Sequence, residues 1–550
     1  MSPSLNQILL FKCRMHFQLP LIFLIASSCF FSCANRVTPS GGKKDITPPK
    51  IISSEPENYS VNFNKKEIRI DFDEFIQLTD LTKQLIISPI IDPMPEITAN
   101  KKSLRIKFDN PLKENKTYTF NFGSSIADVH EKNILENFLL VFSTGDYLDS
   151  LSVTGNVIHA ENLKPEKGIL VMLYKENEDS IPYKKLPDYF AKTDSSGRFA
   201  IHNISSGSFK IFALKDKNSN YLFDSPDESI AFSDSLIVMG DSTSAHLELF
   251  TNAADKMRLK NSALEEQGKL KLIFNSPAGD IKLTSVSPAK NPWLLEEYSA
   301  GRDTVILWMN DTAIDSLKIV VRQNEQPVDT AVFALKKKSS GKGALAKTFA
   351  LISNVNTGTL DAGKDLKLEF THPVKDIDER KIIFKKDSVI SSGAKISFPD
   401  SVKRKLTIKY GWKENEQYDI IFLPGAFKSI FNAENDTTKL SFRLKPAAEF
   451  GSVLLKIKTT EKNTNYIIQL VNDKDEMVRE KNISSSEDIN FEYLDPGIYR
   501  AKMIVDENKN NRWDTGNYPE KIQPEKVIYY TDLLTIRANW DLEQEWNLEK

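Results

Sequence analysis

Cysteine is almost absent from this chain. All three cysteines lie within the first 33 residues, so the rest of the sequence has no disulfide, no thiol nucleophile and no thiolate metal site. Histidine is scarce as well, and none of the six histidines has the H-x-H or H-x-x-x-H spacing of metal ligands. The G-x-S-x-G motif of serine hydrolases is also missing. The sequence therefore gives no sign of catalysis by a thiol, by a zinc ion or by a serine in such a motif.

An excess of one charge is missing too. The 550 residues include 73 Lys and Arg against 75 Asp and Glu, a formal net charge of −2. Removal of an N-terminal segment with Lys12 and Arg14 would leave 71 against 75, or −4. This balance gives no electrostatic reason to expect a nucleic-acid partner. The length exceeds what one hydrophobic core supports and predicts about four to five domains.

The N-terminus has the pattern of an export signal. Lys12 and Arg14 precede an apolar run from Leu19 to Phe31, which is too short for a typical membrane-spanning helix. Polar residues with Pro and Gly follow, as expected of a flexible tether. The sequence predicts a signal peptide over residues 1–32, cleaved after Ser32, and a tether over residues 33–46.

A cysteine directly after such a run resembles a bacterial lipoprotein signal, in which the new N-terminal cysteine is acylated. Cys33 is the expected lipidation site, and Cys29, preceded by Ala26-Ser27-Ser28, is the alternative. An ordinary cleaved signal or an uncleaved anchor also remains open. The resemblance implies a lipid-anchored protein of the outer membrane. The residues after Cys33 lack an acidic run, which favours the periplasmic face over the cell surface.

Alternating polar and apolar residues dominate the chain beyond residue 51. The segments 67–72, 103–108 and 117–122 all show this period of two, which is typical of half-buried antiparallel strands. Long helical periodicity is scarce. The sequence predicts an all-β protein of tandem β-sandwich domains.

Two families are resembled along the chain. The Pro56-Glu57-Asn58 turn, the segment 113–118 and the closing Phe142-Ser143-Thr144-Gly145 resemble the bacterial Ig-like domain of the SbsA type, over residues 47–147. Thr193-Asp194-Ser195-Ser196-Gly197-Arg198-Phe199 and the strand after it resemble the transthyretin-like, or carboxypeptidase-regulatory-like, sandwich, over residues 148–250. Together with the lipoprotein start, the chain resembles lipoproteins of the Bacteroidetes.

The pair of domains is predicted to occur twice. Asn115 and Asn415 are 300 residues apart, Phe72 and Phe370 are 298 apart, and Asp216 and Asp506 are 290 apart. Near-constant offsets indicate an internal repeat. A second Ig-like domain is therefore expected over residues 348–447 and a second transthyretin-like domain over 448–550. Between the pairs we expect a β-rich unit of no recognised family over 251–338 and a linker over 339–347.

Two loops share the pattern D-x-N-x-N-x-x-x-D, an arrangement of oxygen ligands that suits calcium. The predicted ligands are Asp216, Asn218, Asn220 and Asp224 in the first loop, and Asp506, Asn508, Asn510 and Asp514 in the second. The Gly at position 6 of an EF-hand is replaced by Tyr221 and Asn511, so a true EF-hand is not expected. The alternative is a pair of hairpins whose Asp and Asn side chains bind only the turn backbone. Asp227 at position 12 predicts that the first site is the tighter one.

The sequence thus predicts a non-enzymatic envelope lipoprotein that acts as a structural or binding module, with Ca²⁺ as the one cofactor considered. Expected partners are the membrane, through the lipid anchor, and envelope proteins or glycans. Two alternatives stay open: a carbohydrate-binding accessory protein and a hydrolase with its site in the middle unit. Sugar stacking or core packing would account for the aromatic residues Trp293, Trp308, Trp412, Trp513, Trp540, Tyr518, Tyr529 and Tyr530.

Overall fold

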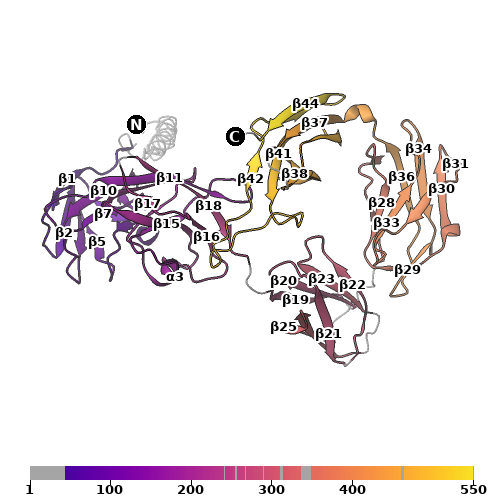
Figure 1. The fold of residues 1–550 in the computed structure, drawn as a ribbon, viewed down its shortest axis with the longest axis horizontal. Coiled ribbons are helices and arrows are strands. Elements are labelled where there is room, and N and C mark those ends of the chain that lie inside the picture. The colour runs from indigo at the N-terminus through magenta and orange to yellow at the C-terminus, as the bar shows by residue number, and fades with distance from the viewer. Residues whose placement is uncertain are drawn as a thin grey trace, which may run out of the picture. The chain divides into compact units, whose positions relative to one another are not determined.

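The computed structural model describes residues 44–548, apart from residues 241, 254–256, 267, 289, 310–313, 336–348 and 460–463. Cys29, Ser32 and Cys33 lie outside the described residues. The regular secondary structure of the described chain is almost entirely β-strand (Figure 1), which confirms the predicted all-β fold of tandem β-sandwiches. The helical turns are α2 (Leu81–Gln84), α3 (Ile181–Lys184), η1 (Glu379–Lys381) and η2 (Ala447–Glu449). Among these residues no helix has the length and apolar character needed to span a membrane.

The chain divides into two compact units. The first ends at residue 148, and the second contains residues 149 onward together with residues 88–90. Strand pairing in the second unit stays within four successive stretches, 151–251, 259–334, 351–444 and 451–547, in the described part of the chain. The domain boundaries given above remain predictions.

The first unit contains three small sheets. Their strands, in order of pairing, are β1 (Ile51–Glu55), β2 (Glu67–Phe72), β6 (Ser103–Lys107) and β5 (Glu96–Asn100); β10 (Leu139–Ser143), β7 (Thr117–Asn121) and β4 (Ile86–Ser88); and β3 (Ile76–Leu78), β8 (Ile126–Asp128) and β9 (Ile134–Leu135). The alternation expected from the sequence is present, because Ile68, Ile70 and Phe72 of β2 are buried while Glu67 and Arg69 are exposed. The buried face packs into one apolar core.

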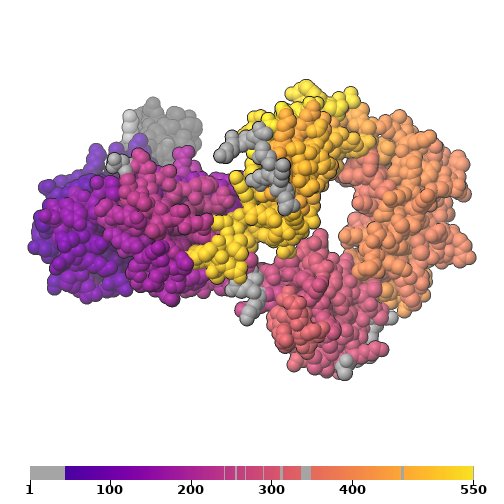
Figure 2. Space-filling model, in the orientation of Figure 1, coloured from indigo at the N-terminus to yellow at the C-terminus, as the bar shows by residue number. Residues whose placement is uncertain are grey.

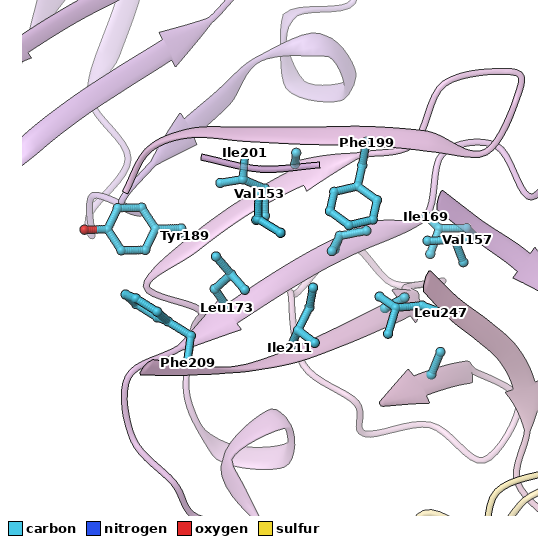
Figure 3. Close-up of a cluster of buried hydrophobic side chains, with 14 of the residues drawn as sticks. Val153, Val157, Ile169, Leu173, Tyr189, Phe199, Ile201, Phe209, Ile211 and Leu247 are labelled. Carbon is cyan, nitrogen blue, oxygen red and sulfur yellow. The ribbon is translucent and has the colours of Figure 1, made fainter. Parts of the chain in front are cut away.

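The stretch 151–251 forms one long sheet that curls around its own core. Its strands are β11 (Leu151–His159), β12 (Leu170–Tyr174), β13 (Tyr189–Lys192), β14 (Arg198–Ile204), β15 (Ser208–Lys215), β16 (Ser229–Phe232), β17 (Ile237–Val238) and β18 (Thr243–Thr251). Figure 3 shows side chains of β11, β12, β14 and β15 turned toward one another, among them Val153, Leu173, Ile201 and Ile211. This core fixes the end of β15, from which the first loop begins.

The stretch 259–334 is a sandwich of a four-stranded and a three-stranded sheet. The first sheet contains β19 (Leu259–Glu266), β20 (Lys269–Phe274), β23 (Thr304–Met309) and β22 (Trp293–Tyr298), and the second contains β21 (Ile281–Ser287), β24 (Ser316–Gln323) and β25 (Gln326–Ala334). One core is shared by both sheets, with Leu272 and Leu307 from the first and Ile319 and Phe333 from the second. The predicted strand 269–274 is β20, and Trp308 lies on β23.

The stretch 351–444 contains eleven short strands. They are β26 (Leu351–Ser353), β27 (Thr359–Leu360), β28 (Leu366–Phe370), β29 (Val374–Ile377), β30 (Ile382–Lys386), β31 (Val389–Ile390), β32 (Lys395–Ser397), β33 (Lys405–Lys409), β34 (Gln417–Phe422), β35 (Phe427–Ser429) and β36 (Thr438–Leu444). The sheet order β26-β28-β33-β32 has the same sequence of pairings as β1-β2-β6-β5 in the first unit. The stretch 351–444 therefore repeats the strand order of this sheet of the first unit, in agreement with the near-constant sequence offset.

The last stretch contains a three-stranded and a five-stranded sheet. The strands are β37 (Gly451–Lys458), β38 (Asn465–Asn472), β39 (Met477–Ile483), β40 (Glu487–Leu494), β41 (Gly497–Asp506), β42 (Val527–Tyr529), β43 (Leu534–Ile536) and β44 (Asp541–Asn547). Here β37 pairs antiparallel with β40 and parallel with β44, just as β11 pairs with β14 and β18. The two stretches therefore share one strand topology, and β41 corresponds to β15.

Candidate functional site

The first loop begins where strand β15 ends. The carboxylate of Asp216 accepts hydrogen bonds from the backbone N–H groups of Ser219 (2.6 Å) and Tyr221 (2.9 Å). The side-chain oxygens of Asn218 and Asn220 each accept from the N–H two residues further on, at 3.1 and 2.8 Å. These three side chains therefore wind the backbone into successive tight turns, as Asx residues do.

The fourth predicted ligand closes the loop. Asp224 accepts hydrogen bonds from the side-chain amides of Asn218 (3.0 Å) and Asn220 (2.6 Å). An amide donates through its nitrogen and accepts through its oxygen, so both Asn side chains link the carboxylate to the backbone turns. The structure thus brings all four predicted residues of this loop into one hydrogen-bonded cluster.

A third carboxylate, which was not predicted from the sequence, binds the backbone of the first loop. Glu228 is completely buried. Its carboxylate accepts from the backbone N–H groups of Lys217 (3.1 Å), Asp224 (3.2 Å) and Ser225 (3.2 Å). Asp227, the residue at position 12, is exposed instead. Glu228 immediately precedes β16. Through these three hydrogen bonds its carboxylate joins both ends of the loop to the start of that strand.

The second loop is built in the same way at the end of β41. Asp506 is fully buried and accepts from the N–H groups of Asn510 (3.0 Å) and Asn511 (2.9 Å). The side-chain amides of Asn508 and Asn510 donate to Asp514. The second set of four predicted residues is therefore also brought together.

Glu525 has the place of Glu228 in the second loop. Its carboxylate accepts from the N–H groups of Glu507 and Asp514, each at 3.0 Å. Burial raises the pKa of Glu525, and the two N–H donors oppose this shift. Asp514 and Asp506 raise the pKa further by charge repulsion. A cation between these carboxylates would relieve that repulsion.

The two loops also share an unusual backbone. Positions 4 and 6 have positive φ in both loops, at 62° and 64° for Ser219 and Tyr221 and at 62° and 60° for Lys509 and Asn511. The left-handed region costs a non-glycine residue roughly 1 kcal/mol. Position 6 therefore adopts, without glycine, the conformation for which EF-hand loops use glycine.

The donor set in each loop is rich in oxygen but not in charge. Among the described residues, no group of three or more His, Cys, Asp or Glu side chains is placed to hold a metal ion. A cation in the first loop would therefore need the amide oxygens of Asn218 and Asn220 beside the carboxylates of Asp216 and Asp224. Hard oxygen donors of this mixed kind suit Ca²⁺ rather than a transition metal.

Trp513 fastens the second loop to its sheet. The indole N–H donates to the backbone oxygen of Glu525 at 2.9 Å, and the ring packs on Ile467, Ile504 and Val527. Of the two roles considered for this residue, ligand stacking and attachment of the loop, the contacts support attachment.

The segment after the second loop contacts the stretch 151–251, as Figure 2 shows for the yellow residues against the magenta ones. The hydroxyl of Tyr518 donates to the backbone oxygen of Asp179 (2.6 Å), and its N–H donates to the side chain of Asn252 (2.9 Å). The ring of Tyr518 lies among aromatic rings that include Phe212 and Phe223. Since Phe223 belongs to the first loop, one aromatic cluster borders both loops.

Most of the remaining aromatic residues pack inside the protein. Trp293 and Trp308 are buried and donate their indole N–H groups to Glu296 and Glu297, each at 2.9 Å. Trp540 differs, because 53% of its surface is exposed. Trp293 packs in the core of its own stretch, whereas Trp308 packs against Val402 and Ile430 of the stretch 351–444.

Fold and loops together define a protein of tandem β-sandwich domains with a repeated oxygen-lined loop. Residues 45–144 match the model of the family described as Bacterial Ig-like domain, which confirms the first Ig-like domain predicted from the sequence. No curated protein has significant sequence similarity to the chain.

Several solved structures resemble parts of the chain at low identity. The Bacillus anthracis TIE protein is 10% identical, with 92% of this chain and 76% of that chain covered. The S-layer protein rSbsC(31-844) is 13% identical, with 88% and 67% covered, and the major pilin subunit BcpA of Bacillus cereus is 10% identical, with 72% and 98% covered. The TM-score is 0.14 in each case, so these similarities carry no argument about function.

Proposed function

We propose that this chain is a non-enzymatic, lipid-anchored envelope protein in which two calcium-stabilised loops hold tandem β-sandwich domains together. The observation that carries the proposal is the shared plan of the two loops. Each has an Asp at the end of the long strand, two Asn side chains joined to a second Asp, and a buried Glu beneath. Such a repeated use of oxygen donors favours a common ligand over two unrelated turns.

Calcium is the cation that this chemistry favours. Carboxylate, amide and backbone oxygens are the ligands of Ca²⁺, and extracellular modules bind it with Kd of about 10⁻⁴ to 10⁻³ M. Binding would exchange the amide donors on Asp224 for the cation and would balance the carboxylates of each loop. That the Asp216 loop binds more tightly than the Asp506 loop stays a prediction.

The test of the calcium proposal is thermal unfolding of the whole chain with EDTA or with about 5 mM calcium. A cation at ten times its Kd stabilises a protein by about 1.4 kcal/mol, so Tm is expected to rise. The double variant Asp216→Asn and Asp506→Asn is expected to lose this rise. Asp194→Asn is the matched control, because Asp194 also accepts two backbone N–H groups but lies outside the loops.

Two results would contradict the calcium proposal. One is an unchanged Tm at millimolar calcium. The other is an equal loss of the calcium effect in the Asp194→Asn control, since this would assign the effect to turn stability in general.

The anchor is proposed from the N-terminal pattern of Lys12, Arg14 and the apolar run before Cys33. Several acyl chains would hold the protein on the outer membrane, because each buried methylene contributes about 0.8 kcal/mol. Mass spectrometry of the mature N-terminus is expected to find acylated Cys33, and Cys33→Ala is expected to abolish the modification. Acylation at Cys29 would show that the lipid anchor is attached there and not at Cys33. A mature N-terminus without acyl chains would contradict the proposal of a lipid anchor. Protease treatment of intact cells distinguishes the periplasmic face from the surface.

Two carboxylates of the middle unit, Glu296 and Glu297, lend the hydrolase alternative no support. Glu296 and Glu297 accept the indole N–H groups of two buried tryptophans, and Glu297 also binds Arg404 at 2.6 Å. These side chains have structural partners. The proposal therefore places no reaction in that unit.

A further inference from the structure

The outer face of the sheet β40-β37-β44 is hollowed at one end. The hollow has a volume of about 540 Å³ and is lined by residues of all three strands and of the turn before β44. In the sheet, Ser452 pairs with Asp541 on one side. On the other side the register shifts between Gly451 and Val453, so that Glu492 and Tyr493 both lie opposite Ser452. The bulge therefore adds one side chain to this end of the face.

Aromatic and apolar groups form one side of this hollow. Trp540 and Tyr493 line it, with 53% and 36% of their surfaces exposed, and Leu454 and Phe450 line it as well. The other five tryptophans of the chain are buried or half-buried. The guanidinium of Arg537, which does not line the hollow, lies 5.0 Å from the centre of the Trp540 ring. Such a cation–π contact holds the indole in place at the rim.

Polar side chains complete the lining. Asn490 donates to Glu492 at 3.0 Å and Ser452 donates to Asp541 at 2.5 Å, and Asn539 also lines the hollow. Among the described residues the lining has two carboxylates and no Lys or Arg. The nearest cations lie behind the lining, with Lys445 over the ring of Phe450 and Arg537 over that of Trp540. The amides supply donors and the carboxylates supply acceptors.

We propose that this hollow binds a neutral saccharide. A pyranose ring has apolar C–H faces that pack on an indole and hydroxyl groups that both donate and accept hydrogen bonds, and concave sites with an aromatic wall and a few converging polar groups bind such small molecules. Hydrogen bonds from hydroxyls to carboxylates are stronger than those between neutral groups. A cationic peptide would satisfy the two carboxylates and, through its backbone carbonyls, the amide donors as well, so the exposed indole of Trp540 is the feature that favours the sugar.

The proposal does not depend on calcium, since none of the loop residues lines the hollow. Its test is titration of the whole chain, in detergent, with neutral hexasaccharides of glucose, mannose, xylose and N-acetylglucosamine up to about 10 mM, followed by tryptophan fluorescence. At least one sugar is expected to bind and to change the fluorescence. Trp540→Ala is expected to weaken binding at least about tenfold, and Glu492→Gln is expected to weaken it less.

Control variants keep the result interpretable. Leu533→Ala removes a side chain that is 61% exposed and lies outside the hollow, and it is expected to bind as the unchanged protein does. Trp540→Phe, which keeps an aromatic ring, is expected to bind with intermediate affinity, and an unchanged Tm shows that each variant is folded. The proposal is overturned if no sugar of the panel binds, if binding survives Trp540→Ala, or if tetralysine binds in place of the sugars.

Discussion

At the scale of single residues, the buried carboxyl of Glu525 makes stability depend on pH. Its pKa is raised above the ordinary 4.5 by burial, so the folded chain holds this proton more tightly than the unfolded chain. Stability without calcium is therefore expected to fall as pH rises from about 4.5 through the raised pKa, by at most about 1.4 kcal/mol per pH unit. Urea midpoints between pH 4 and 7 measure this slope.

Glu525→Gln is the variant that isolates this residue. Glutamine does not titrate, so the difference in stability between the unchanged chain and the variant is expected to shrink or change sign across that pH range. A difference that stays constant with pH would show that Glu525 does not contribute. Calcium binds ionised carboxylates, and protonation at low pH competes with it. The rise in Tm that calcium causes is therefore expected to become smaller toward low pH.

The sequence predicted some, but not all, of the side chains that form the hydrogen-bonded cluster of each loop. The eight Asp and Asn side chains follow a fixed local spacing, and the structure brings each set of four together. Glu228 and Glu525 could not be found this way, because they follow Asp216 by 12 residues and Asp506 by 19. Their position depends on where the next strand begins, and no constant spacing records that.

At the scale of elements, the strands were predictable and their contacts across domains were not. The alternation of Ile68 and Ile70 with polar neighbours fixes which face is buried. By contrast, the contact of Tyr518 with Asn252 joins residues 266 positions apart. This contact depends on how two folded surfaces fit together. Neither sequence stretch contains a local pattern that would predict such a fit.

The contact between the segment around Tyr518 and the stretch 151–251 can be tested by adding a single methyl group at Gly516. A Cβ at this position would lie 2.7 Å from the ring of Phe250 and 2.8 Å from the backbone oxygen of Ile522. Gly516→Ala is therefore expected to destabilise the chain by about 1–3 kcal/mol, with faster proteolysis between residues 515 and 525. Urea unfolding and limited digestion measure the two effects.

The control for this substitution is Gly411→Ala. A Cβ at Gly411 would meet nothing within 4 Å, so the same chemical change is expected to have little effect there. Equal destabilisation by both variants would mean that the contact made by residues 516–518 contributes nothing of its own.

At the scale of the whole molecule, the segment around Tyr518 covers an aromatic surface on the stretch 151–251. Phe212, Phe223 and Phe232 are each at most 6% exposed and lie within 6.4 Å, ring centre to ring centre, of Tyr518. A chain that ends at residue 446 would expose these rings to water. Exposed apolar patches promote association, so this chain is expected to bind the dye ANS more strongly and to self-associate in sedimentation.

Separately produced residues 447–548 provide the control for the truncation. Their addition is expected to lower dye binding again, because they restore Tyr518 to its partners. A truncated chain that stays monomeric and binds no more dye than the full one would show that the aromatic surface is covered in another way.

The same contact sets an order of events during biogenesis. Domains generally fold from the N-terminus as the chain is made, at about 5–20 residues per second, and Tyr518 follows Asn252 by 266 residues. The aromatic surface is therefore complete about 13–53 s before the segment that covers it has been synthesised. During that interval the nascent chain exposes these aromatic rings, so a holding chaperone is expected to bind residues 151–251 until Tyr518 and its neighbours cover them.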